Sequence, residues 1–264
     1  IAKVKICTSG AGAAAIACMN MLIAVGATRE NIWIADSKGL VTKVRHNSVD
    51  RWRGAFAQNT DKTELSEVMA GADIYVGLSK AGALKPEMMK DMAPNPLILA
   101  LSNPTPEIMP ELAREARPDA MICTGRSDYP NQVNNVLCFP FLFRGALDCG
   151  ATVINEEMKA AAAHAIAKLA HEPGLEASAH GVPAIFGSDY LIPNPFDQRL
   201  ILRIAPAVAK AAMDSGIATR PIEDLDAYRE KLMQFVFRTG LLMKPVFDAA
   251  RADDYAWLEA ASAR

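Results

Sequence analysis

The stretch that decides the fold is Lys3-Val-Lys-Ile-Cys-Thr8, followed at once by Ser9-Gly-Ala-Gly-Ala-Ala-Ala15. The first part is a short apolar run, which predicts a buried strand. The second part opens an apolar, Ala-rich segment that predicts a helix over 12–25, with Gly26 just past its end. The chain therefore begins with a strand, a glycine-containing turn and a helix.

The turn carries the pattern G-x-G-x-x-A in the context that a dinucleotide site requires. Gly10 permits the tight turn, Gly12 lets the backbone approach a pyrophosphate, and Ala15 is small enough for close packing of helix and strand. The helix N-terminus, which includes Ala13, offers free N–H groups to phosphates. The alternative is a glycine turn that only connects two packed elements.

Four further apolar runs predict buried strands, at 31–36, 73–78, 96–101 and 120–124. Helical segments separate them. One is predicted to start at Asp61, with Glu64 in capping-box spacing, and to end at Gly71. Pro86 and Pro110 occupy expected first-turn positions of two others. This alternation predicts an α/β fold with a doubly wound, Rossmann-like parallel sheet.

The strands stop after about residue 131, and the rest of the chain predicts helices at 155–171, 197–215 and 224–239. Asn155 is a plausible N-cap of the first, Pro206 is expected to kink the second, and Gly240 to close the third. The segment 172–195 reads as a loop. We therefore expect a dinucleotide-binding domain over 1–150 and a C-terminal helical extension over 151–264.

Asp36 closes the second predicted strand, where a residue that binds the adenosine ribose is expected. A carboxylate there favours the free 2′-hydroxyl of NAD. Ser37 and Lys38 follow immediately and suit the 2′-phosphate of NADP, and Lys43 and Arg45 are further candidate cations. The residues leave the choice of cofactor open at this point.

Three further loops follow predicted strands and should lie at the ligand-binding edge of the sheet. Ser79 follows the third strand and is a candidate cofactor contact. Asn103 follows the fourth, and Pro104 favours an extended Asn103 whose amide projects from the sheet. An amide-rich stretch at 131–135 follows the fifth and can recognise a carboxylate or carboxamide. The alternative for each amide is a cap or a turn that ends an element.

Composition excludes several classes of function. The chain has 264 residues, 22% charged, and a net charge of −2 without long runs of one sign, which argues against a nucleic-acid or membrane surface. No apolar stretch reaches the roughly 20 residues of a membrane span. Five scattered cysteines without a C-x-x-C pair favour a reduced, cytoplasmic protein. The start at Ile1 reads as a cut point inside a longer protein.

Three long motifs together resemble the malic enzyme family, most closely its bacterial NADP-dependent type. They are Ser9-Gly-Ala-Gly-Ala-Ala-Ala15, Leu99-Ala-Leu-Ser-Asn-Pro-Thr-Pro-Glu-Ile108 and Thr124-Gly-Arg-Ser-Asp-Tyr-Pro-Asn-Gln-Val-Asn-Asn-Val-Leu-Cys-Phe-Pro-Phe141. The resemblance implies oxidative decarboxylation of (S)-malate to pyruvate and CO₂, with NAD(P) and Mg²⁺ or Mn²⁺. By the match of motifs, Asn103 and Asn135 resemble the family asparagines that touch malate and the nicotinamide end.

The resemblance also implies what these residues lack. In the family the catalytic Tyr and Lys and the acidic metal ligands precede the G-x-G strand, in sequence that is not present here. We therefore assign no catalytic residue and no metal ligand to this chain, and expect the isolated chain to be inactive on malate. The resemblance further implies NADP in preference to NAD, and at least a dimer.

Two other interpretations remain open at the level of sequence. One is another nicotinamide dehydrogenase with the same sheet, such as an amino-acid or tetrahydrofolate dehydrogenase. The other is a dinucleotide-binding module without chemistry of its own. A Tyr, a Lys and clustered Glu and Asp upstream would discriminate in favour of the malate enzyme.

Overall fold

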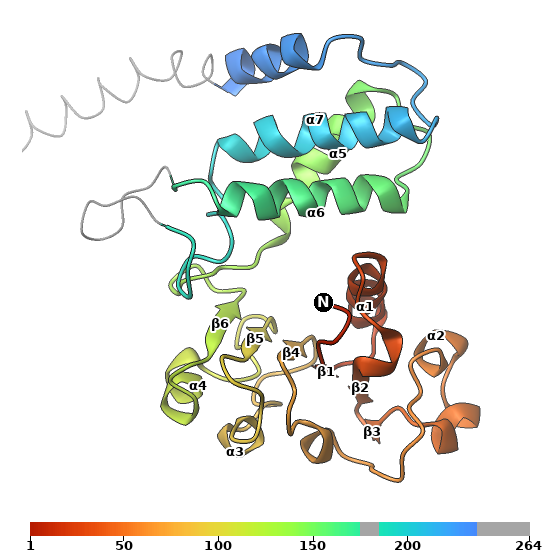
Figure 1. Ribbon diagram of the computed structural model, residues 1–264, viewed down its shortest axis with the longest axis vertical. Coiled ribbons are helices and arrows are strands. Elements are labelled where there is room, and N and C mark those ends of the chain that lie inside the picture. Colours follow the sequence, from red (N-terminus) through yellow and green to blue (C-terminus); the bar gives the residue numbers. More distant parts are fainter. Residues whose placement is uncertain (175–184, 237–264) are drawn as a thin grey trace, which may run out of the picture. The chain divides into compact units, whose positions relative to one another are not determined.

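The computed structural model of this chain describes residues 1–174 and 185–236. Within them, a sheet of six strands runs in the order β3-β2-β1-β4-β5-β6, flanked by helices (Figure 1). The strands are β1 (Ile6–Ser9), β2 (Ile32–Asp36), β3 (Gly39–Leu40), β4 (Ile74–Gly77), β5 (Leu97–Ala100) and β6 (Met121–Thr124). All five predicted strands are present and pair in parallel, which confirms the doubly wound, Rossmann-like sheet.

The helices follow the predicted alternation. They are α1 (Ala13–Ala24), α2 (Arg51–Gly54), α3 (Pro86–Met89), α4 (Pro110–Ala116), α5 (Phe139–Asp148), α6 (Glu156–Ala170) and α7 (Arg199–Asp214), with 3₁₀ turns η1 (Arg29–Asn31), η2 (Lys43–Ser48), η3 (Leu65–Val68) and η4 (Asn135–Leu137). Pro86 and Pro110 stand in first turns as predicted, and Gly26 has a φ of 104° after α1. A left-handed glycine at this position ends a helix without strain.

One local prediction is wrong, and one short element was not predicted at all. The capping box does not use Asp61 and Glu64; it pairs Glu64 with Glu67 at the start of the short 3₁₀ turn η3, because Leu65 and Val68 are the residues that reach the core. The edge strand β3 was not predicted. It has two residues and pairs antiparallel to β2, and such a short segment carries no period in the sequence.

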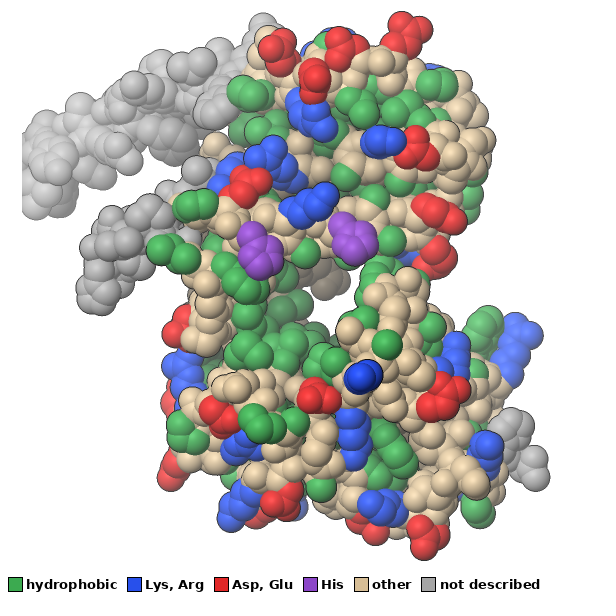
Figure 2. All heavy atoms as spheres, in the orientation of Figure 1, with side chains coloured by type: hydrophobic (Ala, Val, Ile, Leu, Met, Phe, Trp, Pro, Cys, Tyr) green, Lys and Arg blue, Asp and Glu red, His purple; other side chains and the backbone are tan. Residues whose placement is uncertain are grey.

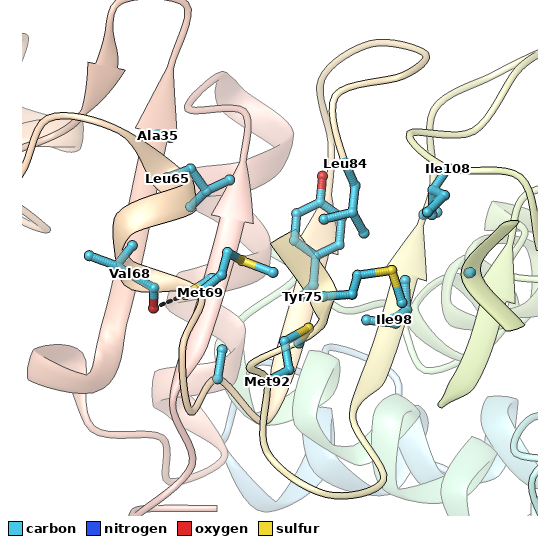
Figure 3. Packing of buried hydrophobic residues seen from close by; sticks show 14 of the residues in the cluster. Ala35, Leu65, Val68, Met69, Tyr75, Leu84, Met92, Ile98 and Ile108 are labelled. Carbon is cyan, nitrogen blue, oxygen red and sulfur yellow. Dashed lines mark hydrogen bonds between the residues drawn. The ribbon is translucent and has the colours of Figure 1, made fainter. Parts of the chain in front are cut away.

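The sheet separates two apolar clusters because neighbouring side chains of a strand point to opposite faces. Ile6 packs with Ile34 and Val76 on one face. Its neighbour Cys7 packs with Tyr75 on the opposite face, and its Sγ lies 3.6 Å from the Val68 carbonyl oxygen. Figure 3 shows Tyr75, Met92 and Ile98 of this second cluster. Each fully buried large side chain contributes about 1.5–3 kcal/mol. The sequence places both clusters through simple alternation.

Backbone contacts divide the chain into two compact units. The first comprises Ile1–Pro140 and Ala163–Asp197, and the second Phe141–Ala162 and Gln198–Arg264. The predicted domain boundary at residue 150 stays a prediction.

Asn155 accepts a hydrogen bond from the Met158 N–H (3.0 Å) at the start of α6, as expected of an N-cap.

The described residues of the second unit are mainly helical, as predicted for the C-terminal part of the chain. A Cβ at Gly145 of α5 would lie 2.4 Å from the Ala205 carbonyl of α7, so the two helices approach closely there. Pro206 lies inside α7, and the kink expected of it stays a prediction. The third predicted helix is present over 225–236, while its expected end at Gly240 lies outside the described residues, as does part of the 172–195 loop.

Charged side chains are mixed rather than separated by sign. On the face drawn in Figure 2, basic and acidic groups of the described residues are interspersed, in keeping with the net charge of −2. Among the described helices, none has the length and apolar character needed to cross a membrane.

Candidate dinucleotide site

The candidate site lies where the strand order reverses. From β1 the chain proceeds outward to β2 on one side, and β4 then pairs with the other side of β1. Crossovers that leave in opposite directions open a crevice at the carboxyl ends of the two central strands, which is where ligands bind in open α/β sheets. The loops after β1, β2 and β4 all end at this crevice.

The two glycines of the first turn are required for different reasons. Gly10 has a φ of 109°, and a Cβ there would lie 2.3 Å from the Leu78 carbonyl oxygen. Its N–H donates to the Ala35 carbonyl (2.8 Å) and so ties the ends of β1 and β2 together. Gly12, the N-cap of α1, has no protein atom within 4 Å of such a Cβ. The space beside Gly12 is therefore open, and the role of Gly12 at the pyrophosphate stays a prediction.

A pocket of about 720 Å³ fills the crevice. It brings together five of the predicted cofactor residues, Gly10, Asp36, Ser37, Lys38 and Ser79. Lys80 also lines the pocket, in the loop after β4 that the sequence places at this edge of the sheet. Residues that the sequence reasoning did not single out complete the lining: Glu64, Leu65 and Ser66 of the η3 region, and Lys85, Glu87 and Met88 around α3. Only the packing of η3 and α3 against the sheet places these residues here.

The other predicted residues lie outside this pocket. Gly12 and Ala13 are exposed at the first turn of α1, and Asn103 and Asn135 are exposed after β5 and near η4. The pocket thus contains the part of the site expected for the adenosine side. The amides assigned to the substrate side occupy the loops after β5 and β6.

Asp36 is not a free carboxylate. Its two oxygens accept hydrogen bonds from one Arg45 nitrogen, at 2.9 and 2.8 Å, and one of them also accepts the Lys38 N–H at 2.8 Å. Arg53 adds an ion pair at 3.6 Å. The Asp36 side chain is only 10% exposed, so these contacts are shielded from solvent. Two arginines therefore neutralise the acid that would otherwise repel a phosphate.

Lys38 itself is exposed and is one of the residues that line the pocket. Arg45 was a predicted candidate cation, but the structure gives it another place. It donates to the Gly39 and Leu40 carbonyls as well as to Asp36 and does not line the pocket. Arg45 thus holds the turn after β2 through contacts outside the pocket, whereas Lys38 lies at the pocket that a ligand would occupy.

Two serines that line the pocket, Ser9 and Ser79, are linked through their hydroxyls to the buried Tyr75. The Ser9 Oγ lies 2.9 Å from the Ser79 Oγ and 2.5 Å from the Tyr75 hydroxyl. Burial raises the pKa of Tyr75 above its ordinary value, so its hydroxyl stays protonated at neutral pH. These bonds hold the turn after β1 against the loop after β4.

Glu107 was missed in the sequence reasoning. It is fully buried, yet its carboxylate accepts hydrogen bonds from the loops after β4 and β5. One acidic letter between Pro106 and Ile108 gives no periodic signal. Only the apolar residues around it, together with its place inside a strand-end motif, hinted at burial.

The amide-bearing loops are more open. The Asn103 amide makes a long hydrogen bond of 3.3 Å to the Leu101 carbonyl and lies against Gly125, where a Cβ would come within 2.6 Å of its Oδ1. Asn134 caps η4 by accepting the Val136 N–H at 3.0 Å. Asn135 makes no side-chain hydrogen bond within the described part of the chain. One amide of this cluster therefore caps, and its neighbour is left available to a ligand.

A divalent metal ion does not fit the described residues. Within 1–174 and 185–236, no group of three or more His, Cys, Asp or Glu side chains is placed to hold one. Acidic residues around the amide-bearing loops are already engaged: Asp128 with Arg126, Glu111 with the Tyr129 hydroxyl, and Glu107 with Ser102.

Comparison with known proteins agrees with this geometry. Residues 1–185 match the family model for the NAD-binding domain of malic enzyme. An NAD-dependent malic enzyme of Rhizobium meliloti is 64% identical over 95% of this chain, and an NADP-dependent malic enzyme of Salmonella typhimurium is 60% identical over 96%. The chain spans about a third of the length of these relatives, 33% and 34%.

Solved structures show the same fold. The crystal structure of a malic enzyme from Pyrococcus horikoshii superposes with a TM-score of 0.79 at 30% identity, covering 96% of this chain and 57% of that one. A malic enzyme of Entamoeba histolytica gives a TM-score of 0.78 at 27% identity, covering 93% and 51%. With the glycine turn, the pocket at the strand reversal and the family match all in agreement, this chain belongs to the malic enzyme family.

Proposed function

We propose that this chain is the dinucleotide-binding part of an enzyme that oxidatively decarboxylates (S)-malate to pyruvate and CO₂. The observation that carries the proposal is the match of residues 1–185 to the NAD-binding domain of malic enzyme. The pocket at the strand reversal supports it, because it combines Gly10 with the Asp36–Lys38 turn. Another dehydrogenase, or a module without chemistry, would leave the Asn103 and Asn135 motifs without a reason.

Each predicted residue has a place in this proposal. Gly10, Gly12 and Ala13 receive the pyrophosphate, with the free N–H groups of α1 directed at it. The turn at 36–38 receives the adenosine ribose, and Ser79 borders the path between the two halves of the cofactor. Asn103 and Asn135 hold the nicotinamide end and malate. When bound, the dinucleotide supplies the hydride acceptor, and this chain's residues orient it.

The remaining chemistry is assigned elsewhere. The described residues offer no metal-holding group, so we propose that the ligands of Mg²⁺ or Mn²⁺, the general base and the general acid lie outside this chain. The curated relatives are about three times its length. The isolated chain should therefore bind the dinucleotide without oxidising malate.

This assignment is tested with purified 1–264. Calorimetry should detect NADP binding, and malate with Mn²⁺ should give no steady production of NADPH. Steady turnover by the isolated chain would mean that the catalytic groups lie within it. Failure to bind either NAD or NADP in a folded sample would overturn the dinucleotide assignment itself.

We further propose that NADP is preferred over NAD. Arg45 and Arg53 neutralise Asp36, which removes the main repulsion against a 2′-phosphate, and Lys38 lines the same pocket. A charge-assisted hydrogen bond contributes about 1.5–3 kcal/mol, and solvent around an exposed lysine favours the lower value. That corresponds to roughly tenfold discrimination. The names of the relatives include both NAD- and NADP-dependent enzymes and do not decide the matter.

The test compares NAD and NADP in the complete enzyme, before and after Lys38→Ala. The preference for NADP should fall about tenfold. Lys43→Ala is the matched control, because Lys43 is exposed on the neighbouring turn but does not line the pocket. Equal or better use of NAD by the unaltered enzyme would defeat the proposal. A preference that survives loss of Lys38 would remove Lys38 as its cause.

We also propose that the complete enzyme works in the cytoplasm as a homo-oligomer. The five cysteines form no disulfide, which suits a reducing compartment. Light scattering of the complete enzyme should give the mass of at least two chains, and a monomer at assay concentration would contradict this.

A further inference from the structure

We propose that Glu107 is a positioning residue that joins the loop after β4 to the loop after β5, so that the cofactor side and the substrate side of the site are held as one unit. The inference rests on the proposed function for the meaning of those two sides. The joint itself rests on contacts within the described chain. Neither the family match nor the pocket assigns Glu107 a role.

The joint consists of three hydrogen bonds that all end on the Glu107 carboxylate. One oxygen accepts the Ser79 N–H at 3.0 Å and the Ser102 hydroxyl at 2.6 Å, and the other accepts the Ser102 N–H at 3.0 Å. The side chain is 0% exposed. It also passes directly over Gly77, where a Cβ would lie 2.4 Å from the carboxyl carbon. A side chain at position 77 would therefore displace the Glu107 carboxylate from its present position.

Burial of a carboxylate is energetically unfavourable, so its presence at position 107 needs a physical explanation. Removing a charged group from water costs several kcal/mol unless donors and cations compensate. Among the described residues no Lys, Arg or His forms an ion pair with Glu107, so the three donors carry the compensation. An apolar replacement would leave these three donors without an acceptor. Glu107 therefore fixes both loops because it satisfies donors that come from each of them.

The two loops joined by Glu107 carry the site's two halves. Ser79 lines the pocket, and its hydroxyl is hydrogen-bonded to the Ser9 hydroxyl, which is in turn hydrogen-bonded to the Tyr75 hydroxyl. Ser102 directly precedes Asn103 at the end of β5. Glu107 therefore couples the positions of the two loops. Positioning of reacting groups is sensitive to displacements of about 1 Å, so such a joint bears directly on hydride transfer.

Backbone bonds connect the same loops further from the strands. The Leu84 N–H donates to the Glu107 carbonyl at 3.1 Å, and the Gly82 N–H to the Pro106 carbonyl at 3.4 Å. These bonds remain when the side chain changes. A substitution at Glu107 should therefore loosen the loops at the strand ends without separating them altogether.

The main test is Glu107→Gln in the complete polypeptide. Glutamine keeps the size, but its NH₂ group faces a donor where an acceptor stood. We expect the dinucleotide dissociation constant and the malate KM each to rise about tenfold. The Ser79 and Ser102 amides should lose hydrogen-exchange protection. Ile98→Ala, a buried substitution in β5, is the control for lost stability alone, and it should leave both constants within about twofold at temperatures where the protein is folded.

A second variant separates the two sides. Ser102→Ala removes one bond on the substrate side and leaves the Ser79 contact in place. The malate KM should rise about threefold, with dinucleotide affinity unchanged. If Ser102→Ala instead weakened dinucleotide binding as much as Glu107→Gln, the assignment of separate sides to the two loops would be wrong.

The outcomes also distinguish this inference from the proposed function. Normal affinities and normal protection of Ser79 and Ser102 in Glu107→Gln would overturn the positioning role. Equal losses in Glu107→Gln and Ile98→Ala would reduce Glu107 to a stability residue. An unaltered protein that binds no dinucleotide would overturn the proposed function, while the exchange measurement would still report on the joint.

Discussion

The two sides of the site differ in how completely this chain builds them. At the ends of β1, β2 and β4, the polar side chains have partners: Asp36 with two arginines, and Ser9 with Ser79 and Tyr75. At the ends of β5 and β6, the Asn103 and Asn135 amides are exposed. Within the described residues, Asn103 makes one long hydrogen bond, to the Leu101 carbonyl, and the Asn135 side chain makes none. The first side is preformed, whereas the second presents groups that still require a partner.

The difference indicates which part of binding this chain can perform by itself. Preformed sites lose little conformational entropy on binding, so the adenosine side should bind ligand without further protein. Exposed amides hold a ligand weakly until surrounding groups exclude water. The open side is therefore where we expect the rest of the enzyme to contribute.

The largest expected effect comes from closing the preformed side. Gly12→Val should weaken dinucleotide binding at least about a hundredfold, because the side chain would occupy the space left for the pyrophosphate. The backbone at Gly12 is extended and no protein atom lies nearby, so thermal stability should change little. Calorimetry and a melting curve on the same sample provide the measurement, and unchanged affinity in a folded variant would contradict it.

Gly10→Ala gives the contrasting outcome. With a φ of 109° and a backbone oxygen 2.3 Å from the new Cβ, alanine there should destabilise the fold by roughly 3 kcal/mol. The loss would appear in denaturant unfolding without any ligand. Equal stability of the Gly10 and Gly12 variants would show that the turn tolerates more than its geometry indicates.

The open side should respond only in the complete enzyme. Asn103→Ala and Asn135→Ala should each raise the malate KM or lower kcat by more than tenfold there. In isolated 1–264, dinucleotide affinity should stay within about threefold of the unaltered chain. A large loss of affinity in the isolated chain would mean that these amides already hold the cofactor, and the two sides would not be separate.

A smaller effect tests how Asp36 is neutralised. Arg45→Ala should free the carboxylate to accept from a ribose hydroxyl and to repel a 2′-phosphate, shifting the NADP:NAD ratio toward NAD by about tenfold or less. Arg114→Ala, which breaks an exposed pair with Asp189, is a control remote from the pocket. An unchanged ratio would remove Arg45 from cofactor choice.

The smallest effect concerns acid. A hydrogen bond from the Tyr129 hydroxyl lowers the pKa of Glu111, and Arg126 lowers that of Asp128. A carboxyl group whose pKa is lower in the folded than in the unfolded state stabilises the fold at pH values above its unfolded-state pKa. This stabilisation is lost as the pH falls through the folded-state pKa. The loop after β6 should therefore be unaffected between pH 7 and 5 and loosen only below about pH 4. Carboxyl midpoints by NMR at or above the unfolded values would contradict this.

The preformed side was largely predictable because its signals are local. A short apolar run, two glycines at fixed spacing and an acid closing the next strand predict the turn, the switch point and five pocket residues. The region of η3 shows the limit. Glu64 was expected inside a capping box begun by Asp61, but either spacing satisfies the local rule, and only burial of Leu65 and Val68 selects the second.

Residues that act across the sequence were not predictable in this way. Arg45 was a candidate cation with no assigned contact. The path of η2 brings its guanidinium to the Asp36 carboxylate, outside the pocket. Glu107 had no assigned role, because its three donors come from loops that the sequence separates by more than twenty residues on one side and by five on the other. Such contacts follow from tertiary packing and leave no period to read.

The missing side chain of Gly77 has a consequence for how this protein can vary over evolutionary time. The space that a Cβ would need there is occupied by the Glu107 carboxyl group, so the two positions share one volume. Alanine at position 77 would force the Glu107 carboxylate to move away from its three donors, whereas loss of the glutamate would leave space that alanine can fill. Among related sequences, the two positions should change together or remain as they are.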